Sequence, residues 1–249
     1  MVTHARFPRL AVLAALALSA CSEPTTPVPG SPSDAAARAL DASAFAERKF
    51  VPRSDNPYFP LVPGTSFHYR SQTPDGIETE DFIVTTGTKR ILGVTTRVVE
   101  DVVRLDGSIT EHTFDWFAQD EETGDVWYFG EDSRQFLDGK LIGTEGSWEA
   151  GRKGAQARII MEGHPKVGDT YREEFARGVA EDMARVLSLN ASVHVPYGSF
   201  RQCLKTENFT RLDPGHREQK YYCPNVGLVL EVIVAGGEGQ NQLVRITRP

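Results

Sequence analysis

Residues 94–119 read VTTRVVEDVVRL-DG-SITEHTFDWFAQ, two runs rich in β-branched and aromatic residues that are separated by Asp106-Gly107. Such runs favour β-strands, and an Asp-Gly pair between them favours a two-residue type I′ turn. The stretch therefore predicts an antiparallel hairpin of the strands Val94–Leu105 and Ile109–Gln119. This hairpin is the strongest local signal in the chain, and it indicates the fold class.

The same texture extends over most of the chain. From Asn56 onward, β-branched and aromatic runs alternate with turn pairs such as Asp138-Gly139 and Pro214-Gly215. Many short strands with tight turns predict an all-β domain, either an antiparallel barrel, closed or nearly closed, or a barrel-like sandwich, with little helix. We expect one domain over residues 50–249. The segment Gly178–Leu189 fits a strand or a helix equally well.

The N-terminus carries an export signal. Arg6 and Arg9 precede Leu10–Ala20, an apolar run of eleven residues that is too short to span a membrane, which takes about 20. Residues 1–20 therefore match a secretory signal peptide. The Leu18-Ser19-Ala20-Cys21 sequence resembles the bacterial lipobox, which implies that Cys21 is lipidated and becomes the mature N-terminus. An ordinary signal peptide with an incidental cysteine is the alternative.

The segment after Cys21 indicates a tether and an address. Residues 21–49 are rich in Pro and Ala, and a Pro-rich segment with little apolar content stays extended and solvated. Ser22, rather than Asp, follows the cysteine, and sorting in diderm bacteria then implies the outer membrane. The protein would face the periplasm or the cell surface.

Charge excludes some partners. The 249-residue chain has 27 Lys and Arg against 34 Asp and Glu, a net charge of −7, and loss of Arg6 and Arg9 with the signal peptide makes it −9. Nucleic acid needs clustered Lys and Arg, so no nucleic-acid partner is expected. Anionic head groups would also repel the chain, so acyl chains must hold it to the membrane.

Three motifs carry a family resemblance: NPYFPLVPGT at residues 56–65, VPYGSF at 195–200 and VGLVLE at 226–231. With these motifs the chain resembles a family of bacterial lipoproteins and exported proteins of uncharacterised function, which are similar in turn to exported tapped β-barrel domains. The resemblance covers about residues 55–235. It implies the β architecture and assigns no catalytic residue.

The first candidate site lies in the 94–119 hairpin. A regular ladder from a two-residue turn would place Asp101 opposite His112, on the face that also carries Val99 and Val103. A carboxylate beside an imidazole raises the pKa of the imidazole and fixes its tautomer. The pair could act as a general base or a ligand anchor, or it could be a satisfied polar pair in the core.

An aromatic cluster is the second candidate site. A four-residue turn at 121–124 would place Trp116 opposite Phe129, on the same face as Phe114 and Trp127. These four side chains are the predicted lining of a site for a small apolar ligand.

Cysteine and metal motifs give one further prediction. Cys203 and Cys223 flank a turn, and an exported compartment permits a disulfide between them, with two buried free thiols as the alternative. No H-E-x-x-H or C-x-x-C motif is present, so neither a metal site nor a cofactor is expected. The acidic turn Asp120–Asp125 does not match a calcium loop.

Three functions remain open from the sequence. The first is a non-catalytic β-barrel module that binds a small apolar ligand or a partner protein. The second is an envelope structural or assembly factor with a packed barrel. The third is a hydrolase that uses Asp101 and His112. An open cavity in the barrel would separate the first from the second, because small barrels are often filled by their own side chains.

Overall fold

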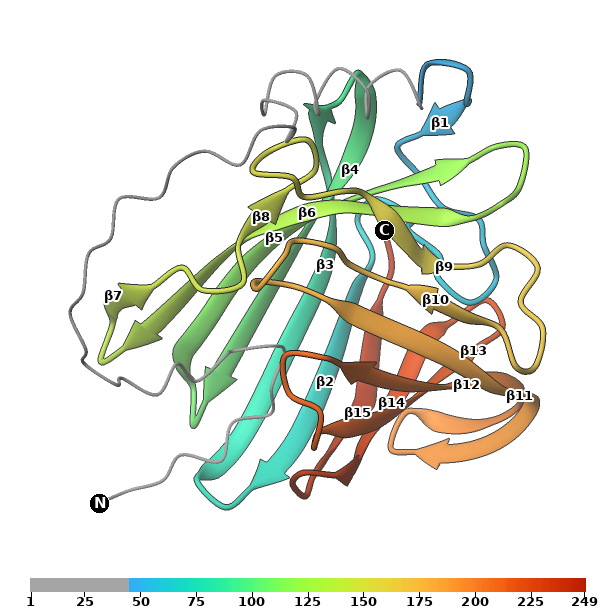
Figure 1. The fold of residues 1–249 in the computed structure, drawn as a ribbon. Coiled ribbons are helices and arrows are strands. Elements are labelled where there is room, and N and C mark those ends of the chain that lie inside the picture. The colour runs from blue at the N-terminus through green and yellow to red at the C-terminus, as the bar shows by residue number, and fades with distance from the viewer. Residues whose placement is uncertain (1–44) are drawn as a thin grey trace.

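The computed structural model describes residues 45–249, and every element named in this part of the chain is a strand (Figure 1). The predicted signal peptide, Cys21 and residues 21–44 of the tether lie outside the described residues. The strands are β1 (Phe50–Val51), β2 (Ser66–Thr73), β3 (Gly76–Ile91), β4 (Val94–Leu105), β5 (Ser108–Asp120), β6 (Val126–Leu137), β7 (Lys140–Gly143), β8 (Trp148–Glu149), β9 (Arg158–Met161), β10 (Thr170–Arg172), β11 (Asp182–Val195), β12 (Gly198–Thr210), β13 (Arg217–Cys223), β14 (Gly227–Ala235) and β15 (Gln240–Thr247).

All the strands belong to one antiparallel sheet, so the all-β prediction is confirmed. Its order is β10-β11-β12-β13-β14-β15-β2-β3-β4-β5-β6-β7, with β1 paired to β5 and with β8 and β9 paired to β6. The sheet curls, so that β2–β6 and β11–β15 form two walls around an interior (Figure 1). Among the described residues, no helix is long and apolar enough to cross a membrane.

The sheet is not closed into a barrel, so the closed alternative among the expected architectures is wrong. Closure needs a continuous ladder between the first and last strands, but β10 and β7 do not pair. These strands have only three and four residues, too few to build that ladder. The two edges are instead linked by an isolated bridge, in which the Gln156 amide donates to the Phe175 carbonyl at 2.8 Å.

Two local features hold neighbouring strands close together. Cys203 on β12 and Cys223 on β13 form a disulfide between fully buried side chains, with 4.2 Å between their Cα atoms. Gly130 on β6 has a φ of 126°, and a Cβ there would collide with the Trp148 carbonyl, so only glycine lets β8 pack this closely. The ambiguous segment Gly178–Leu189 is a turn followed by β11.

Candidate functional site

The turn of the β4–β5 hairpin has the geometry expected from its sequence. Leu105 pairs with Ser108, and Asp106 and Gly107 have φ values of 48° and 85°. Positive φ at both central residues is the type I′ arrangement. The sequence therefore specified this turn.

The register beyond the turn differs from the regular ladder. A β-bulge next to Thr110 shifts the pairing by one residue, so Asp101 pairs with Thr113, and His112 pairs with Val102. A one-residue shift moves a side chain to the opposite face of a sheet. The expected pairing of Asp101 with His112 is therefore wrong, because their side chains lie on opposite faces.

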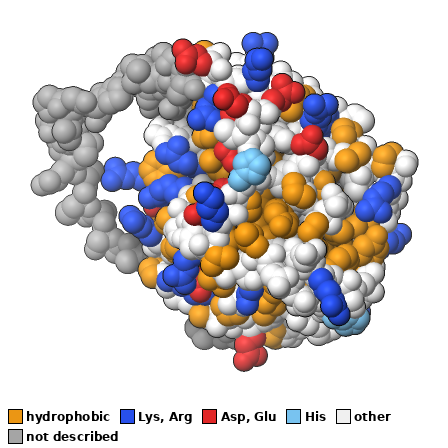
Figure 2. All heavy atoms as spheres, turned by 90° about the vertical axis from the view of Figure 1, so that its right-hand side faces the viewer, with side chains coloured by type: hydrophobic (Ala, Val, Ile, Leu, Met, Phe, Trp, Pro, Cys, Tyr) orange, Lys and Arg blue, Asp and Glu red, His pale blue; other side chains and the backbone are white. Residues whose placement is uncertain are grey.

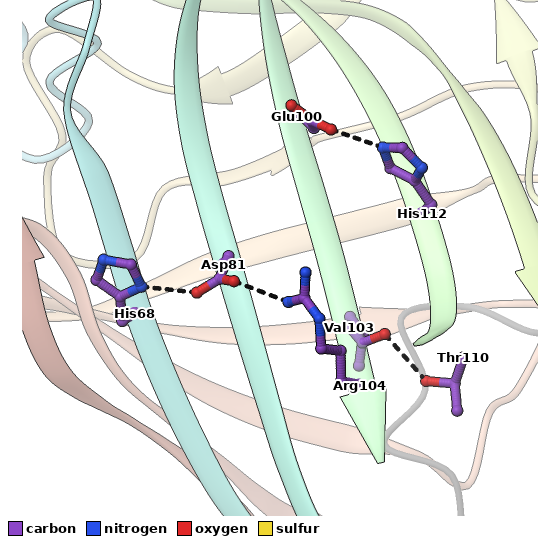
Figure 3. Close-up of polar contacts among 7 residues, drawn as sticks. All are labelled: His68, Asp81, Glu100, Val103, Arg104, Thr110 and His112. Atoms are coloured by element: carbon purple, nitrogen blue, oxygen red, sulfur yellow. Dashed lines mark hydrogen bonds and ion pairs between the residues drawn. The ribbon is translucent and has the colours of Figure 1, made fainter. Parts of the chain in front are cut away.

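His112 instead binds a carboxylate on the outer face of the sheet. Its Nε2 atom lies 2.9 Å from Glu100 Oε1, and both side chains are partly exposed (Figure 3). Asp101 faces inward, is 1% exposed and pairs in register with Phe82. These placements leave no surface on which Asp101 and His112 could act together.

A second histidine network lies on the same outer face. Asp81 Oδ1 is 2.6 Å from His68 Nδ1, and Asp81 Oδ2 accepts a hydrogen bond from Arg104 at 2.8 Å (Figure 3). His68 Nε2 is 3.2 Å from Thr247 Oγ1, in the order hydroxyl, imidazole and carboxylate. The network lies outside the interior cavity described below, and Arg104 takes up part of the Asp81 charge. We assign it to strand pairing.

The predicted aromatic face is divided among separate places. A second bulge, between Asp115 and Phe117, shifts β5 against β6, so Trp116 does not lie opposite Phe129. Trp116 lies under the Lys89 ammonium, which is 3.2 Å from its ring centroid.

The other three predicted aromatic residues also lie away from the interior cavity. Phe114 lies beside His112 on the outer face, with 4.7 Å between the ring centroids. Trp127 and Phe129 pack against Phe45, with their ring centroids 5.5 Å from its own. The predicted lining of four aromatic side chains is therefore replaced by a different set.

The interior of the curled sheet is a cavity. Its volume is about 670 Å³, and its lining comes from the inner faces of β2, β3, β5, β6 and β12–β14. Cavities of roughly 300–1,000 Å³ are the size that holds a small organic ligand. The protein thus has an open interior rather than a packed one.

Two of the sequence motifs contribute to the lining of the cavity. Phe59, Pro60 and Leu61 line it together with the start of β14. The Asn225 amide donates to the Pro57 carbonyl at 2.7 Å and ties the two segments together. Two of the three resemblance motifs therefore lie together at the cavity.

The exposed members of the lining come from the connections between strands, and they are Pro74, Glu145, Asp213, Gly236, Gly237 and Glu238.

The lining of the cavity is partly aromatic. Phe117 and Tyr128 stack with 4.7 Å between their ring centroids, and the Tyr69 hydroxyl donates to the Leu228 carbonyl at 3.0 Å. The aromatic lining residues are Phe59, Phe67, Tyr69, Phe82, Phe117, Tyr128, Phe209 and Tyr222.

The same wall is strongly acidic. Among the described residues, twelve Asp and Glu side chains line the cavity, against one Lys and one His. The acidic residues are Glu80, Glu111, Asp115, Glu131, Glu145, Glu173, Glu174, Asp182, Asp213, Glu218, Glu231 and Glu238, and the two cations are Lys220 and His216. Over one third of the 34 acidic residues of the chain thus face one cavity.

Lys220 contacts two of the acids that line the cavity. Its Nζ lies 3.4 Å from Glu231 Oε2 and 3.7 Å from Glu218 Oε2. Glu218 also contacts His216 Nε2 at 2.8 Å, and this hydrogen bond raises the pKa of His216. Both cations are therefore shared among carboxylates that outnumber them.

Burial perturbs the acids beside Lys220. It raises the pKa of Glu173 to about 7 and that of Asp182 to about 6, although Lys220 acts in the opposite direction on both. Asn208 donates to Glu173 Oε2 at 2.7 Å. Glu174 has its pKa raised well above the ordinary value, by burial and then by the charge of Asp182. Near neutral pH the cavity therefore holds protons that exposed carboxylates would release.

A tyrosine organises the acids on the other wall. The Tyr128 hydroxyl lies 2.5 Å from Asp115 Oδ1 and 3.1 Å from Glu131 Oε2. Burial raises the pKa of Tyr128 well above its ordinary value, so the hydroxyl keeps its proton as a donor. The single O–H of Tyr128 thus lies within hydrogen-bonding distance of both acids and donates to one of them at a time.

The acidic side chains do not gather into a metal site. No group of three or more His, Cys, Asp or Glu side chains in the described residues is placed to hold a metal ion. The acids are distributed from the exposed turns to the buried middle of the cavity.

Comparisons with known proteins give weak structural likenesses. A candidate exported protein with a YmcC-like fold from Bacteroides fragilis has a TM-score of 0.45 and 13% sequence identity, and the alignment covers 77% of this chain and 99% of that one. A candidate lipoprotein from Parabacteroides distasonis has a TM-score of 0.42 and 12% identity with the same coverage. No protein-family model and no curated protein sequence matches the chain.

Proposed function

We propose that the mature protein is a non-catalytic envelope lipoprotein that binds a small ligand in the interior of its curled sheet. The cavity of about 670 Å³ is the observation that carries this proposal. Its size and the apolar side chains in its lining, such as Phe59 and Leu61, are typical of a ligand site. A structural factor with a packed barrel would have no use for such a space.

A hydrolase is less well supported. Asp101 and His112 point to opposite faces of the sheet, and the His68 network lies on the outer face, away from the cavity. Ester hydrolysis needs a nucleophile, a base and a place for the substrate within one site. The two histidine contacts do not provide that combination.

Binding can be tested with Nile red, a neutral apolar dye that fluoresces in a water-poor site. We expect saturable fluorescence with the wild-type protein. Ile233→Trp would fill part of the cavity, since Ile233 lines it, and it should weaken binding. Its neighbour Val232 does not line the cavity, so Val232→Trp is the matched control. Equal binding by both variants would place the dye elsewhere and contradict the proposal.

Anchoring is tested separately. We propose that Cys21 carries the acyl chains that hold the acidic protein to the outer membrane, because the lipobox resemblance places a cysteine there. Cys21→Ala should leave soluble or uncleaved precursor. If this variant still fractionates with membranes after a high-salt wash, lipidation is not what anchors the protein.

A further inference from the structure

Exposed apolar side chains gather at one end of the sheet. Neighbouring strands are antiparallel, so the β2–β3, β4–β5, β6–β7, β12–β13 and β14–β15 connections all lie at the same end, which we call the turn end (Figure 1). Among the described residues, six of the ten exposed large hydrophobic side chains belong to hairpins that finish at the turn end, and these are Ile77, Ile109, Leu137, Leu141, Ile142 and Val234. Single exposed apolar residues are ordinary, but a group of them at one place marks a contact surface.

The β6–β7 hairpin has the highest concentration of these side chains. Leu137, Leu141 and Ile142 are 57%, 56% and 52% exposed. Leu137 pairs with Lys140, the neighbour of Leu141, so Leu137 and Leu141 point to opposite faces of the hairpin. β7 is also the last strand on its side of the sheet. The end of this hairpin is therefore an apolar tip that is exposed on both faces.

A tip with this shape fits a lipid surface better than the flat surface of another protein. The apolar boundary of a bilayer surrounds an inserted tip, so both faces of the hairpin leave water together. A flat protein surface would cover one face of the hairpin and leave the other in water. The two-sided exposure therefore favours lipid as the occupant.

The interior cavity reaches the same end of the sheet. Pro74, Asp213 and Glu238 lie in connections of the turn end, and all three line the cavity. A bilayer in contact with the turn end would lie next to the cavity. An apolar ligand could then pass between the two with little exposure to water, a consequence that rests on the proposed function.

The charge of the connections selects the type of lipid. Their five acids stand against Arg211 and His216, and Lys140 adds one cation next to the β6–β7 turn. The acids are Asp75, Asp106, Asp138, Asp213 and Glu238. Negative charge in these turns repels anionic head groups. Contact with lipid must therefore come from the apolar side chains, and it should favour a zwitterionic bilayer.

The proposed anchor allows this orientation. The described chain begins beside the opposite end of the sheet, where β1 pairs with Gln119 and Asp120 of β5. The 13 residues of β5 span about 43 Å. The segment 22–44 could reach up to about 75 Å if it were fully extended. An anchor at Cys21 is therefore compatible with a turn end that faces the bilayer.

We infer that the turn end is a membrane-contact surface, and that the β6–β7 tip enters the head-group region of a zwitterionic bilayer. Leu137, Leu141 and Ile142 supply the apolar contact. The inference goes beyond the proposed function, because it gives the protein a second point of contact with the membrane besides the proposed acyl chains.

Vesicle flotation without the anchor tests this surface. The chain is produced from Ser22 onward, so that it carries neither signal peptide nor acyl chains and keeps every described strand. We expect it to float with phosphatidylcholine vesicles. At low salt, replacing part of this lipid by phosphatidylglycerol should weaken binding by about threefold or more, and added salt should reduce the difference.

Matched double variants locate the contact. Leu137→Ser with Leu141→Ser should weaken binding to phosphatidylcholine vesicles by about fivefold or more, because apolar area no longer leaves water. Val62→Ser with Val167→Ser is the control, since these side chains are 53% and 64% exposed and lie outside the turn-end hairpins. The control should float like the unsubstituted chain. Urea midpoints of both variants should match it, because all four side chains are exposed.

The outcomes separate this inference from the proposed function. If the unsubstituted chain does not float, the bilayer is excluded and a partner protein becomes the occupant of the surface. If both double variants lose binding equally, or if phosphatidylglycerol strengthens binding, the inference is also wrong. Nile red binding in the cavity depends on none of these results, so failure of the membrane contact leaves the cavity function standing.

Discussion

The two faces of the same sheet treat their acidic side chains in opposite ways. On the outer face, carboxylates meet cations on neighbouring strands, as Asp81 meets His68 and Arg104, and as Glu207 meets Arg185 at 2.8 Å. On the inner face, twelve acids share one Lys and one His among the described residues. Figure 2 shows part of the exterior, where Lys and Arg side chains are scattered among hydrophobic ones and most Asp and Glu lie near one edge.

The difference separates ion pairs that join neighbouring strands from charged side chains that line the cavity. Cross-strand ion pairs on an exposed face contribute little stability and need no ligand to explain them. Burial of charged side chains costs stability, so we expect a change among the charged residues of the inner face to alter stability more than a similar change on the outer face. Substitutions on the two faces should therefore differ in their effect on stability.

The largest effect is expected from Lys220→Met. Lys220 lies between Glu218 and Glu231, and its loss removes a cation that contacts both of these acids. We expect the free energy of unfolding at pH 8 to fall by roughly 2–3 kcal/mol, measured by urea denaturation. Arg104→Met removes a cation from the outer face and should cost less than about 1 kcal/mol. Equal losses of stability would contradict the proposed difference between charged residues on the inner and outer faces.

The second prediction concerns pH. Glu173 has a pKa of about 7 in the folded protein against an ordinary value of 4.5, so the folded state binds more protons than the unfolded state between these values. The stability contribution of Glu173 is therefore present below pH 4.5 and is lost as pH rises through 7. Glu173→Gln should flatten this slope and raise stability at pH 8 by on the order of 1–3 kcal/mol. Urea titrations at pH 5.5 and 8 measure both quantities, and an unchanged slope would contradict the assignment.

The smallest effect is expected from Glu100→Gln. This change removes the charge of a partly exposed acid paired with His112. We expect the free energy of unfolding at pH 7 to fall by less than about 1 kcal/mol. A loss as large as that of Lys220→Met would mean that the outer pair carries more than a surface contact.

The fold class and one turn could be predicted from the sequence, because both depend on local residue preferences. The Asp106-Gly107 pair specifies its turn through positive φ, and β-branched runs indicate strands. The inner and outer faces could not be predicted. They depend on the bulges at Thr110 and Trp116, and a bulge of one residue has no strong signature in a single sequence.

The cavity could not be predicted from the sequence either, for a different reason. Its acids extend along the chain from Glu80 to Glu238 and meet only when the sheet curls. One local signal was present: in β13, Glu218, Lys220 and Tyr222 alternate on one face, so charged and aromatic residues share the side that faces inward. Charged residues at the inward positions of a strand are the pattern that could have indicated an interior site.

The most direct test of the account is a fluorescence titration of Nile red against two variants on neighbouring residues of β14. We predict that Ile233→Trp, which fills part of the cavity, weakens binding, and that Val232→Trp, whose residue does not line the cavity, leaves it unchanged. Equal binding by both variants would contradict the claim that the interior cavity is the ligand site.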